Sequence, residues 1–318
     1  MTEPRTKLTI GTRGSKLALW QAEFIKSMLE EATGLPVEIK KIKTTGDKIL
    51  DVPLAKVGGK GLFTKELEVQ LLSGGVDLCV HSMKDVPTEL PEGCVLAGMP
   101  PRVDPRDVLV SHNGEDLVTL PQGGRVGTSS LRRVAQVRAL RPDVEIVDVR
   151  GNLDTRMHKA EDGDVDVVIL AAAGIKRLGY GDRISNFIPT EQMVSAVGQG
   201  AIGIEVREDD EFMLEVCDRI SDADTLTCVT AERVVMNLLE GGCQVPIGAY
   251  ARIEDGKLVM DAMVGSVSGD RIIRTYVESD INDPIDLGTR ATAELRELGA
   301  VEILNEIRLA DGATELLS

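Results

Sequence analysis

Two short stretches of the chain carry the residue types most suited to chemistry. Residues 239–248, LEGGCQVPIG, place Cys243 in a glycine-rich turn, where a thiolate is reachable. Residues 80–87, VHSMKDVP, place Lys84 and Asp85 at the end of an apolar run. A reachable thiol is a nucleophile that can carry a covalently bound group, and a carboxylate in a cleft can offset a developing positive charge. Together they indicate an enzyme.

Each of these residues also has a purely structural explanation. Isolated cysteines are commonly buried and inert. A helix predicted at 226–239 directs the negative end of its dipole toward Cys243, which does not favour the thiolate form. Asp85 precedes a Val-Pro pair and fits a turn or a cap equally well. The wider pattern of the chain therefore has to decide between the two explanations.

The composition narrows the possible partners. The chain has 318 residues and a net charge of −16, from 36 Lys and Arg against 52 Asp and Glu. Such acidity disfavours nucleic acid and anionic membranes, and no apolar run approaches the roughly 18 residues of a membrane span. The N-terminus lacks the apolar core of a signal peptide, and five scattered cysteines and three histidines give no disulfide framework or metal motif. We expect a metal-free protein of the reducing cytoplasm.

Alternating strand and helix patterns predict two α/β domains, each with a mostly parallel sheet. In the first domain, strands are predicted at 7–11, 37–44 and 76–81, and helices at 15–32 and 64–72. After a proline-rich linker at 100–105, strands are predicted at 107–111, 125–128, 145–149 and 165–170, and helices at 130–140 and 155–161. A further strand at 202–206 follows a glycine-rich crossing at 196–200, and we expect it to return to the first domain.

The pattern changes after about residue 222. Hairpin turns join short alternating strands here, which predicts a small α+β domain with an antiparallel sheet. The predicted elements are a helix at 226–239, strands at 249–253, 258–264 and 272–277, and a final helix at 285–306. We therefore expect three domains, made of residues 1–100 with 200–219, residues 105–195, and residues 222–318.

Basic residues recur just after the predicted strands of both α/β domains. Ligands of open α/β sheets bind beyond the carboxyl ends of strands, and arginine grips carboxylates or phosphates with a bidentate fork. Any one of these residues has an ordinary explanation as a solvated surface charge, but their recurrence at one topological position predicts a cleft for a polyanion. They are Arg13, Lys56, Lys60, Lys84, Arg132, Arg133, Arg150, Arg156 and Arg177.

Together these stretches resemble the porphobilinogen deaminases, also called hydroxymethylbilane synthases. The resemblance extends from about residue 8 to residue 306. The motifs that carry it lie at 12–15, 56–63, 81–87, 127–133, 150–152, 197–201 and 239–248. It implies two α/β lobes of the type II periplasmic-binding-protein kind, the first completed by a segment after the second. It also implies a small α+β C-terminal domain that carries the cysteine.

The resemblance implies a transferase that joins four porphobilinogen molecules head to tail, releases ammonia each time and hydrolyses the chain to hydroxymethylbilane. The family's cofactor is a dipyrromethane held by a thioether, here on Cys243, and Asp85 would be the catalytic carboxylate that stabilises the cation left by ammonia. By resemblance, the cofactor would be bound by Lys84, Ser129, Arg132, Arg133, Asp47, Lys56 and Ser15. The substrate would be bound by Arg13, Arg150, Arg156, Arg177, Phe63, Lys60 and Gln199. We expect a cytoplasmic monomer.

Two other functions remain open. A two-lobed anion-binding protein, such as a solute-binding protein or a sensor, would use the same cleft without catalysis. It would not need Cys243, but we expect it to have a signal peptide or a helix-turn-helix, and the sequence has neither. An acyl- or phosphotransferase that uses Cys243 is disfavoured because no histidine or metal motif accompanies the thiol.

Overall fold

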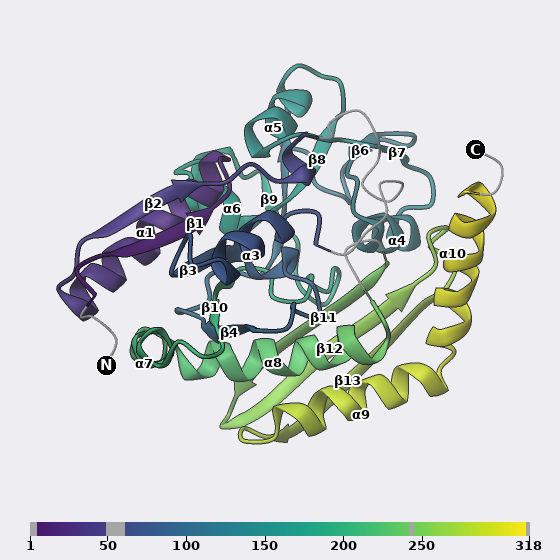
Figure 1. The fold of residues 1–318 in the computed structure, drawn as a ribbon. Coiled ribbons are helices and arrows are strands. Elements are labelled where there is room, and N and C mark those ends of the chain that lie inside the picture. The colour runs from purple at the N-terminus through teal and green to yellow at the C-terminus, as the bar shows by residue number, and fades with distance from the viewer. Residues whose placement is uncertain (1–4, 49–60, 242–244, 316–318) are drawn as a thin grey trace. The chain divides into compact units, whose positions relative to one another are not determined.

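The computed structural model of the chain (Figure 1) describes residues 5–48, 61–241 and 245–315. The chain divides into two compact units. The first unit comprises the described residues within 1–51, 59–103 and 200–226, and the second those within 104–199 and 227–318. The boundaries at 103/104 and 199/200 fall inside the predicted linker and the predicted crossing. Within the described residues, no helix is long and apolar enough to cross a membrane.

The first unit is built on a five-stranded sheet in the order β2-β1-β3-β10-β4. Strands β1, β2 and β3 are parallel, whereas β10 runs antiparallel to both β3 and β4. The predicted return of the strand after the glycine-rich crossing is thus confirmed. The strands are β1 (Leu8–Thr12), β2 (Val37–Lys41), β3 (Leu78–Ser82), β4 (Cys94–Gly98) and β10 (Ile202–Arg207).

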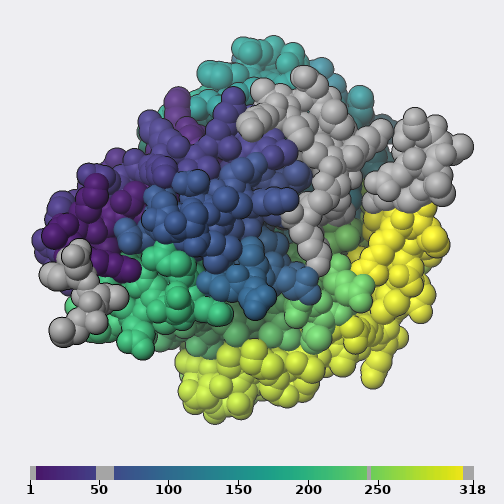
Figure 2. Space-filling model, in the orientation of Figure 1, coloured from purple at the N-terminus to yellow at the C-terminus, as the bar shows by residue number. Residues whose placement is uncertain are grey.

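Helices cover both faces of this sheet. Helix α1 (Lys16–Thr33) and α7 (Glu211–Arg219) pack on one face, and α3 (Lys65–Leu72) packs on the other. Figure 2 shows the green surface of α7 against the purple N-terminal segment, although the two are far apart in the sequence. Helix α1 begins at Ser15, whose side chain accepts a hydrogen bond from the amide of Ala18, and ends at Gly34 in the left-handed conformation.

The second unit repeats this strand order. Its α/β sheet has the order β7-β6-β8-β5-β9, with β6, β7 and β8 parallel and β5 antiparallel to β8 and β9. The strands are β5 (Asp107–Ser111), β6 (Arg125–Gly127), β7 (Glu145–Val147), β8 (Val167–Ala171) and β9 (Asn186–Phe187). Three helices follow strands of this sheet: α4 (Leu131–Leu140), α5 (Leu153–Glu161) and α6 (Ala172–Arg177).

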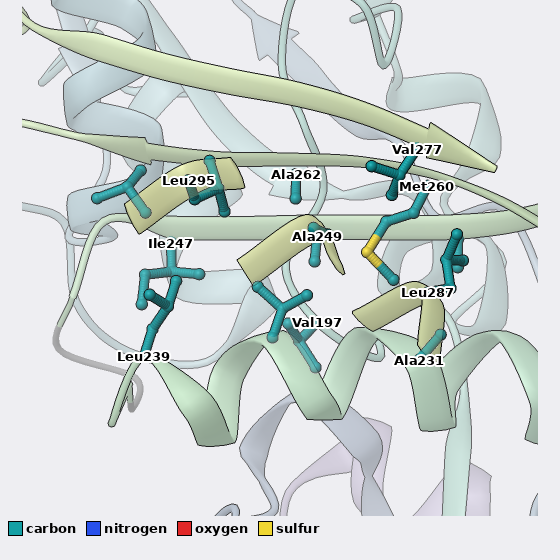
Figure 3. Packing of buried hydrophobic residues seen from close by; sticks show 14 of the residues in the cluster. Val197, Ala231, Leu239, Ile247, Ala249, Met260, Ala262, Val277, Leu287 and Leu295 are labelled. Carbon is teal, nitrogen blue, oxygen red and sulfur yellow. The ribbon is translucent and has the colours of Figure 1, made fainter. Parts of the chain in front are cut away.

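The C-terminal part is an antiparallel sheet covered by helices. Its strands β11 (Ile247–Glu254), β12 (Lys257–Gly265) and β13 (Ile272–Asp280) pair in chain order. Its helices are α8 (Ala223–Leu238), α9 (Pro284–Glu297) and α10 (Ala300–Glu315). Figure 3 shows Ala231 of α8, Met260 of β12 and Leu287 of α9 meeting in one aliphatic core.

The predicted fold class is confirmed by these sheets: two α/β sheets of matched strand order and a small α+β part with an antiparallel sheet. The division into three domains stays a prediction. One predicted element was wrong, because the helix expected at 285–306 is two helices, α9 and α10. They are separated at Gly299, whose φ of 98° is accessible to glycine and breaks the helical path. The strands β4 and β9 and the helices α6 and α7 were not predicted, nor was the short helix α2 (Thr45–Lys48).

Candidate active site

A pocket in the first unit lies beyond the carboxyl ends of β1 and β3, the edge at which open α/β sheets bind ligands. Its walls come from the turn after β1, the first turns of α1, the end of β3 and the start of α3. Three residues predicted from the sequence to contact ligand, together with the predicted catalytic carboxylate, are among its lining residues. The polar and aromatic lining comprises Arg13, Ser15, Gln21, Phe63, Thr64, His81, Ser82 and Asp85.

Arg13 is held on three sides within this pocket. Its Nε and Nη2 donate to Oδ1 of Asp47 at 3.1 and 2.5 Å. Its guanidinium carbon lies 4.0 Å from the centroid of the Phe63 ring, and its Nη1 lies 4.0 Å from Oδ2 of Asp85. A planar guanidinium can stack on a ring and donate in its plane at the same time, which a lysine ammonium cannot do. The side chain keeps 23% of its surface exposed, so it remains accessible to a ligand.

Asp47 is held in place by Thr44, three residues earlier in the chain. Its Oδ2 accepts from the amide and the hydroxyl of Thr44, at 3.3 and 2.8 Å. Burial raises the pKa of Asp47, but its hydrogen bonds with Arg13 and the charge of Arg13 outweigh burial, so the pKa lies below its usual value. Asp47 is therefore a carboxylate whose Oδ1 is already bound by Arg13. A carboxylate repels the carboxylates of the predicted cofactor, so its geometry supports a role through Arg13 instead.

The remaining predicted residues of this pocket lie at element ends. The hydroxyl of Ser15 caps α1. Lys84 and Asp85 belong to a short 3-10 turn, η2 (Met83–Asp85), that directly follows β3. The Asp85 side chain is 34% exposed, and the nearby Arg13 guanidinium supplies a positive charge. The pocket thus offers an accessible carboxylate beside a fixed cation.

The second unit carries a different cluster at the corresponding edge of its sheet. Oδ2 of Asp107 accepts from Nη1 of Arg132 at 2.7 Å, and its Oδ1 accepts from Nε and Nη2 of Arg133 at 3.1 and 2.7 Å. Burial raises the pKa of Asp107, but the two arginines outweigh it and hold the pKa well below its usual range. Burial also lowers the pKa of Arg132. Two guanidiniums share one carboxylate, so the buried cluster has a positive surplus.

Asp107 was not among the predicted site residues. It is the first residue of β5, and because β5 runs antiparallel to β8, its start lies beside Ala171 at the carboxyl end of β8. The amide nitrogen of Gln199 donates to the carbonyl of Pro105 at 2.7 Å and to Oδ1 of Asp107 at 2.9 Å. The predicted substrate contact of Gln199 would have to displace one of these bonds if it used the same nitrogen.

Four more predicted residues follow the carboxyl ends of β6, β7 and β8. Ser129 and Arg150 lie in the loops after β6 and β7, whereas Arg156 belongs to α5 and Arg177 is the last residue of α6. The hydroxyl of Ser129 donates to the carbonyl of Val149 at 2.5 Å, and Nε of Arg156 donates to the carbonyl of Gly151 at 3.0 Å. Nη1 of Arg150 is buried and has no hydrogen-bond partner among the residues that the structure describes. Burial lowers the pKa of Arg177 to about 10. These loops and the helices that follow them therefore gather positive charge that is partly withdrawn from solvent.

Three predicted residues, Cys243, Lys56 and Lys60, lie outside the described residues, so their roles stay predictions. The four cysteines that are described are all buried. Burial raises the pKa of Cys79 well above its usual value and raises the pKa values of Cys94 and Cys217 to about 12. In the described ranges, no group of three or more His, Cys, Asp or Glu could hold a metal ion.

The chain matches known protein families along most of its length. Residues 8–215 match the family described as porphobilinogen deaminase, dipyromethane cofactor binding domain, and residues 226–297 match the porphobilinogen deaminase C-terminal domain. The chain belongs to the porphobilinogen deaminase family. The predicted pyrrole-polymerising transferase and its dipyrromethane cofactor are thereby confirmed, and a non-catalytic anion-binding protein is not favoured.

Individual relatives agree with this assignment. The porphobilinogen deaminase of Syntrophobacter fumaroxidans is 50% identical over 301 residues, which are 94% of this chain and 97% of that protein. That of Geobacter sulfurreducens is 48% identical over 302 residues, 95% of each chain. Among solved structures, the methionine-binding protein MetQ is similar with a TM-score of 0.43 and 12% identity, over 68% of this chain and 88% of that one. Because this TM-score is low, the fold class rests on the strand order of the two α/β sheets and not on this similarity.

The residues of the second unit fit a dipyrromethane. Each pyrrole ring derived from porphobilinogen carries an acetate and a propionate, so the group is a polyanion. Arg132 and Arg133 share the single carboxylate of Asp107, and Arg150 has a buried nitrogen without a partner among the described residues. Buried positive charge in surplus is unfavourable unless an anion offsets it. A carboxylate-rich cofactor would supply that charge.

Proposed function

We propose that porphobilinogen reacts in the pocket of the first unit, with Asp85 as the catalytic carboxylate. The observation that carries this proposal is the fixed guanidinium of Arg13, stacked on Phe63 and bound by Asp47, with Asp85 4.0 Å from its Nη1. Arg13 can bind a substrate carboxylate without moving. Asp85 is left half-exposed for the part of the substrate that becomes positive.

The chemistry of each condensation determines what Asp85 must do. The C–N bond of the aminomethyl group breaks, ammonia leaves with the electron pair, and the pyrrole is left with a positive charge. The Asp85 side chain would offset this charge and accept a hydrogen bond from the pyrrole N–H. The dipyrromethane supplies the pyrrole α-carbon to which the new unit is joined.

The basic residues would divide the carboxylates between them. We assign substrate carboxylates to Arg13, Arg150, Arg156 and Arg177, with contributions from Phe63, Lys60 and Gln199. We assign the cofactor to Lys84, Ser15, Ser129, Arg132, Arg133 and Lys56. Asp47 would act through Arg13, which it holds in place. The thioether to Cys243 follows from the family resemblance.

Replacement of Asp85 tests the proposal. Asp85→Asn keeps the shape but removes the charge, so turnover of cofactor-loaded enzyme should fall by about 10²–10³-fold, the size seen when one electrostatic stabiliser is removed. Asp85→Glu should retain more turnover than Asp85→Asn. Asp218→Asn, an exposed carboxylate on α7, is the matched control and should change turnover less than twofold. An Asp85→Asn enzyme within threefold of the wild type would rule out the assignment.

Intact mass tests the attachment site. The purified protein should carry a mass excess equal to two porphobilinogens less two ammonias, and Cys243→Ser should lack it. Cys94→Ser, which alters a buried thiol, should keep it. An excess that persists in Cys243→Ser would place the cofactor on another residue.

We also propose that the protein is a cytoplasmic monomer with three domains, as the family resemblance implies. Light scattering of the loaded enzyme should give the mass of one chain, 34.2 kDa, plus cofactor. A concentration-independent dimer would contradict the monomer.

A further inference from the structure

The two faces of the sheet in the first unit differ in chemistry. Successive side chains of a strand point to opposite faces. The face under α1 and α7 is apolar, whereas the face under α3 carries the buried polar residues His81 and Glu205. The apolar face is formed by Leu78, Val80, Ile202, Ile204 and Val206.

His81 and Glu205 form a buried pair across β3 and β10. In the antiparallel register, His81 is opposite Gly203 and Glu205 is opposite Cys79, so the two side chains are diagonal neighbours on one face. Nε2 of His81 lies 2.7 Å from Oε2 of Glu205, and the side chains are 3% and 0% exposed. Such a short contact in a dry environment fixes the imidazole firmly.

The surroundings of the pair supply further acidic groups. Glu68 of α3 is buried, and its pKa is raised by burial and by the charge of Glu205. The thiols of Cys79 and Cys94 lie near the same carboxylate, and the cation Arg207 donates to the carbonyls of Leu71 and Val76. A buried carboxylate in this environment requires a donor, and His81 is one.

We propose that Glu205 is a positioning residue that fixes His81 in a single tautomer, so that the pocket has a second proton acceptor beside Asp85. An ionised carboxylate can only accept, so the proton of the neutral imidazole is held on Nε2 and the lone pair is held on Nδ1. His81 lines the same pocket as Asp85. The inference rests on the proposed function of that pocket.

This arrangement answers a need of the reaction. When the new C–C bond forms, the C–H bond at the joined α-carbon breaks, and its electrons restore the aromatic ring. Nδ1 of His81 takes that proton and passes it to the ammonia released in the earlier C–N cleavage, which becomes ammonium. Asp85 then need not take up this proton and continues to offset the positive charge. A carboxylate that orients an imidazole while another group faces the substrate is an established division of labour in enzymes.

Nitrogen NMR tests the tautomer without relying on turnover. The chain has three histidines, so ¹⁵N-histidine labelling gives few signals. In the neutral imidazole of His81, we expect the proton on Nε2 in the wild type. In Glu205→Gln, the amide can either accept from Nε2 or donate to it, so the proton should be divided between Nε2 and Nδ1 instead of being held on Nε2. An unchanged tautomer in Glu205→Gln would overturn the proposal.

The chain offers a matched control in His158 and Glu161. This is also a His–Glu pair, with Nδ1 of His158 2.9 Å from Oε2 of Glu161, but it lies at the surface. Glu161→Gln should leave the His81 signals and the turnover unchanged. If Glu205→Gln fails to fold, Glu205→Asp serves in its place, because it keeps the charge and moves it. It should retain the Nε2 proton with reduced turnover, and loss of that proton would count against the proposal.

Kinetics distinguish positioning from a structural role. With cofactor loading equal by intact mass, Glu205→Gln should lower kcat by about 10–10²-fold, within the range of general-base effects, and change KM less than twofold. In a His81→Gln background the same change should lower kcat less than threefold, because residues that act as one unit are not additive. If Glu205→Gln lowered kcat by the same factor of about 10–10² in the His81→Gln background, Glu205 would have a structural role and would not act through His81. Loss of turnover in Asp85→Asn with none in Glu205→Gln would remove this inference and leave the proposed function intact.

Discussion

The ligand edges of the two α/β sheets share a strand order but have opposite charge balances. In the first unit, one guanidinium, Arg13, lies between two carboxylates, Asp47 and Asp85, and all three side chains are partly exposed. In the second unit, one carboxylate, Asp107, lies between two guanidiniums, Arg132 and Arg133, and all three are buried. The same topological position therefore serves two electrostatic purposes.

Under the proposed function, the first cluster would serve the reaction and the second would hold the cofactor. A surplus of accessible negative charge suits the transient cation of the condensation. A surplus of buried positive charge suits the permanent carboxylates of a bound cofactor, because an ion pair strengthens as water is removed. Partial exposure keeps the first cluster available to successive substrates, whereas burial makes the second rigid. The following changes test this distinction, and the largest effect comes first.

Asp107→Asn should have the largest effect on stability. It leaves two buried guanidiniums without a charge partner, and breaking a buried pair in this way destabilises by about 3–5 kcal/mol. The change in the free energy of unfolding is measured by urea denaturation, from the unfolding transition of the second unit. Asp143→Asn is the matched control, since Asp143 pairs with Arg141 at the surface, and it should leave the midpoint nearly unchanged. Equal effects of the two variants would show that burial does not distinguish the clusters.

Arg13→Lys should act on turnover instead of stability. Lysine keeps the charge but cannot both donate a fork to Asp47 and stack on Phe63. We expect kcat/KM to fall by about 10–10²-fold, which corresponds to the loss of a charge-assisted bidentate contact of about 1.5–3 kcal/mol. Arg219→Lys, at the end of α7, should have no effect. A kcat/KM within twofold of the wild type would mean that charge alone suffices at this edge.

Gly46→Ala should have a smaller effect on the same cluster. A Cβ atom at Gly46 would lie 2.2 Å from the Phe63 ring, so the ring must move off its place beside Arg13. Overpacking of this kind destabilises by about 1–2 kcal/mol, and kcat/KM should fall a fewfold. Thermal unfolding and steady-state kinetics measure both. The double variant with Phe63→Leu should regain stability but not turnover, and recovery of both would remove Phe63 from the site.

The smallest effect is the pH dependence of the Asp107 cluster. Its folded-state pKa lies well below the usual value, so its stabilisation is complete above the unfolded pKa of about 3.9 and is lost as the pH falls. The advantage of the wild type over Asp107→Asn should be constant from pH 5 to 7 and about 0.7 kcal/mol smaller at pH 3.5. Urea midpoints at each pH measure it. An advantage that grows on acidification would contradict the ionised state of Asp107.

Local patterns in the sequence predicted most of the elements because they depend on neighbours in the chain. The strand at 107–111 has the predicted bounds, and α1 begins and ends within one residue of its prediction. The merged C-terminal helix failed because nothing in the apolar periodicity marks the left-handed conformation of Gly299. Strand β4 and helix α7 were missed although both are well formed.

The site was predicted as a set of residue types and not as a set of pairs. The resemblance named Arg13, Asp47, Arg132 and Arg133, but their partners are set by tertiary structure. Asp107 is 26 positions from Arg133, and Glu205 is 124 positions from His81. No period or motif joins such distant positions. The antiparallel course of β5 and β10 brings the starts of those strands to the ligand edge.

The buried cysteines have a consequence for how a protein handles a reactive intermediate of its own making. Departure of ammonia creates an electrophilic carbon, which would alkylate any thiolate within reach. Because burial raises the pKa values of Cys94 and Cys217 to about 12, both thiols stay protonated at pH 8. Burial thus makes these two thiols poor nucleophiles. Because burial keeps these thiols protonated from the moment the chain folds, they are protected from alkylation before any electrophile is formed.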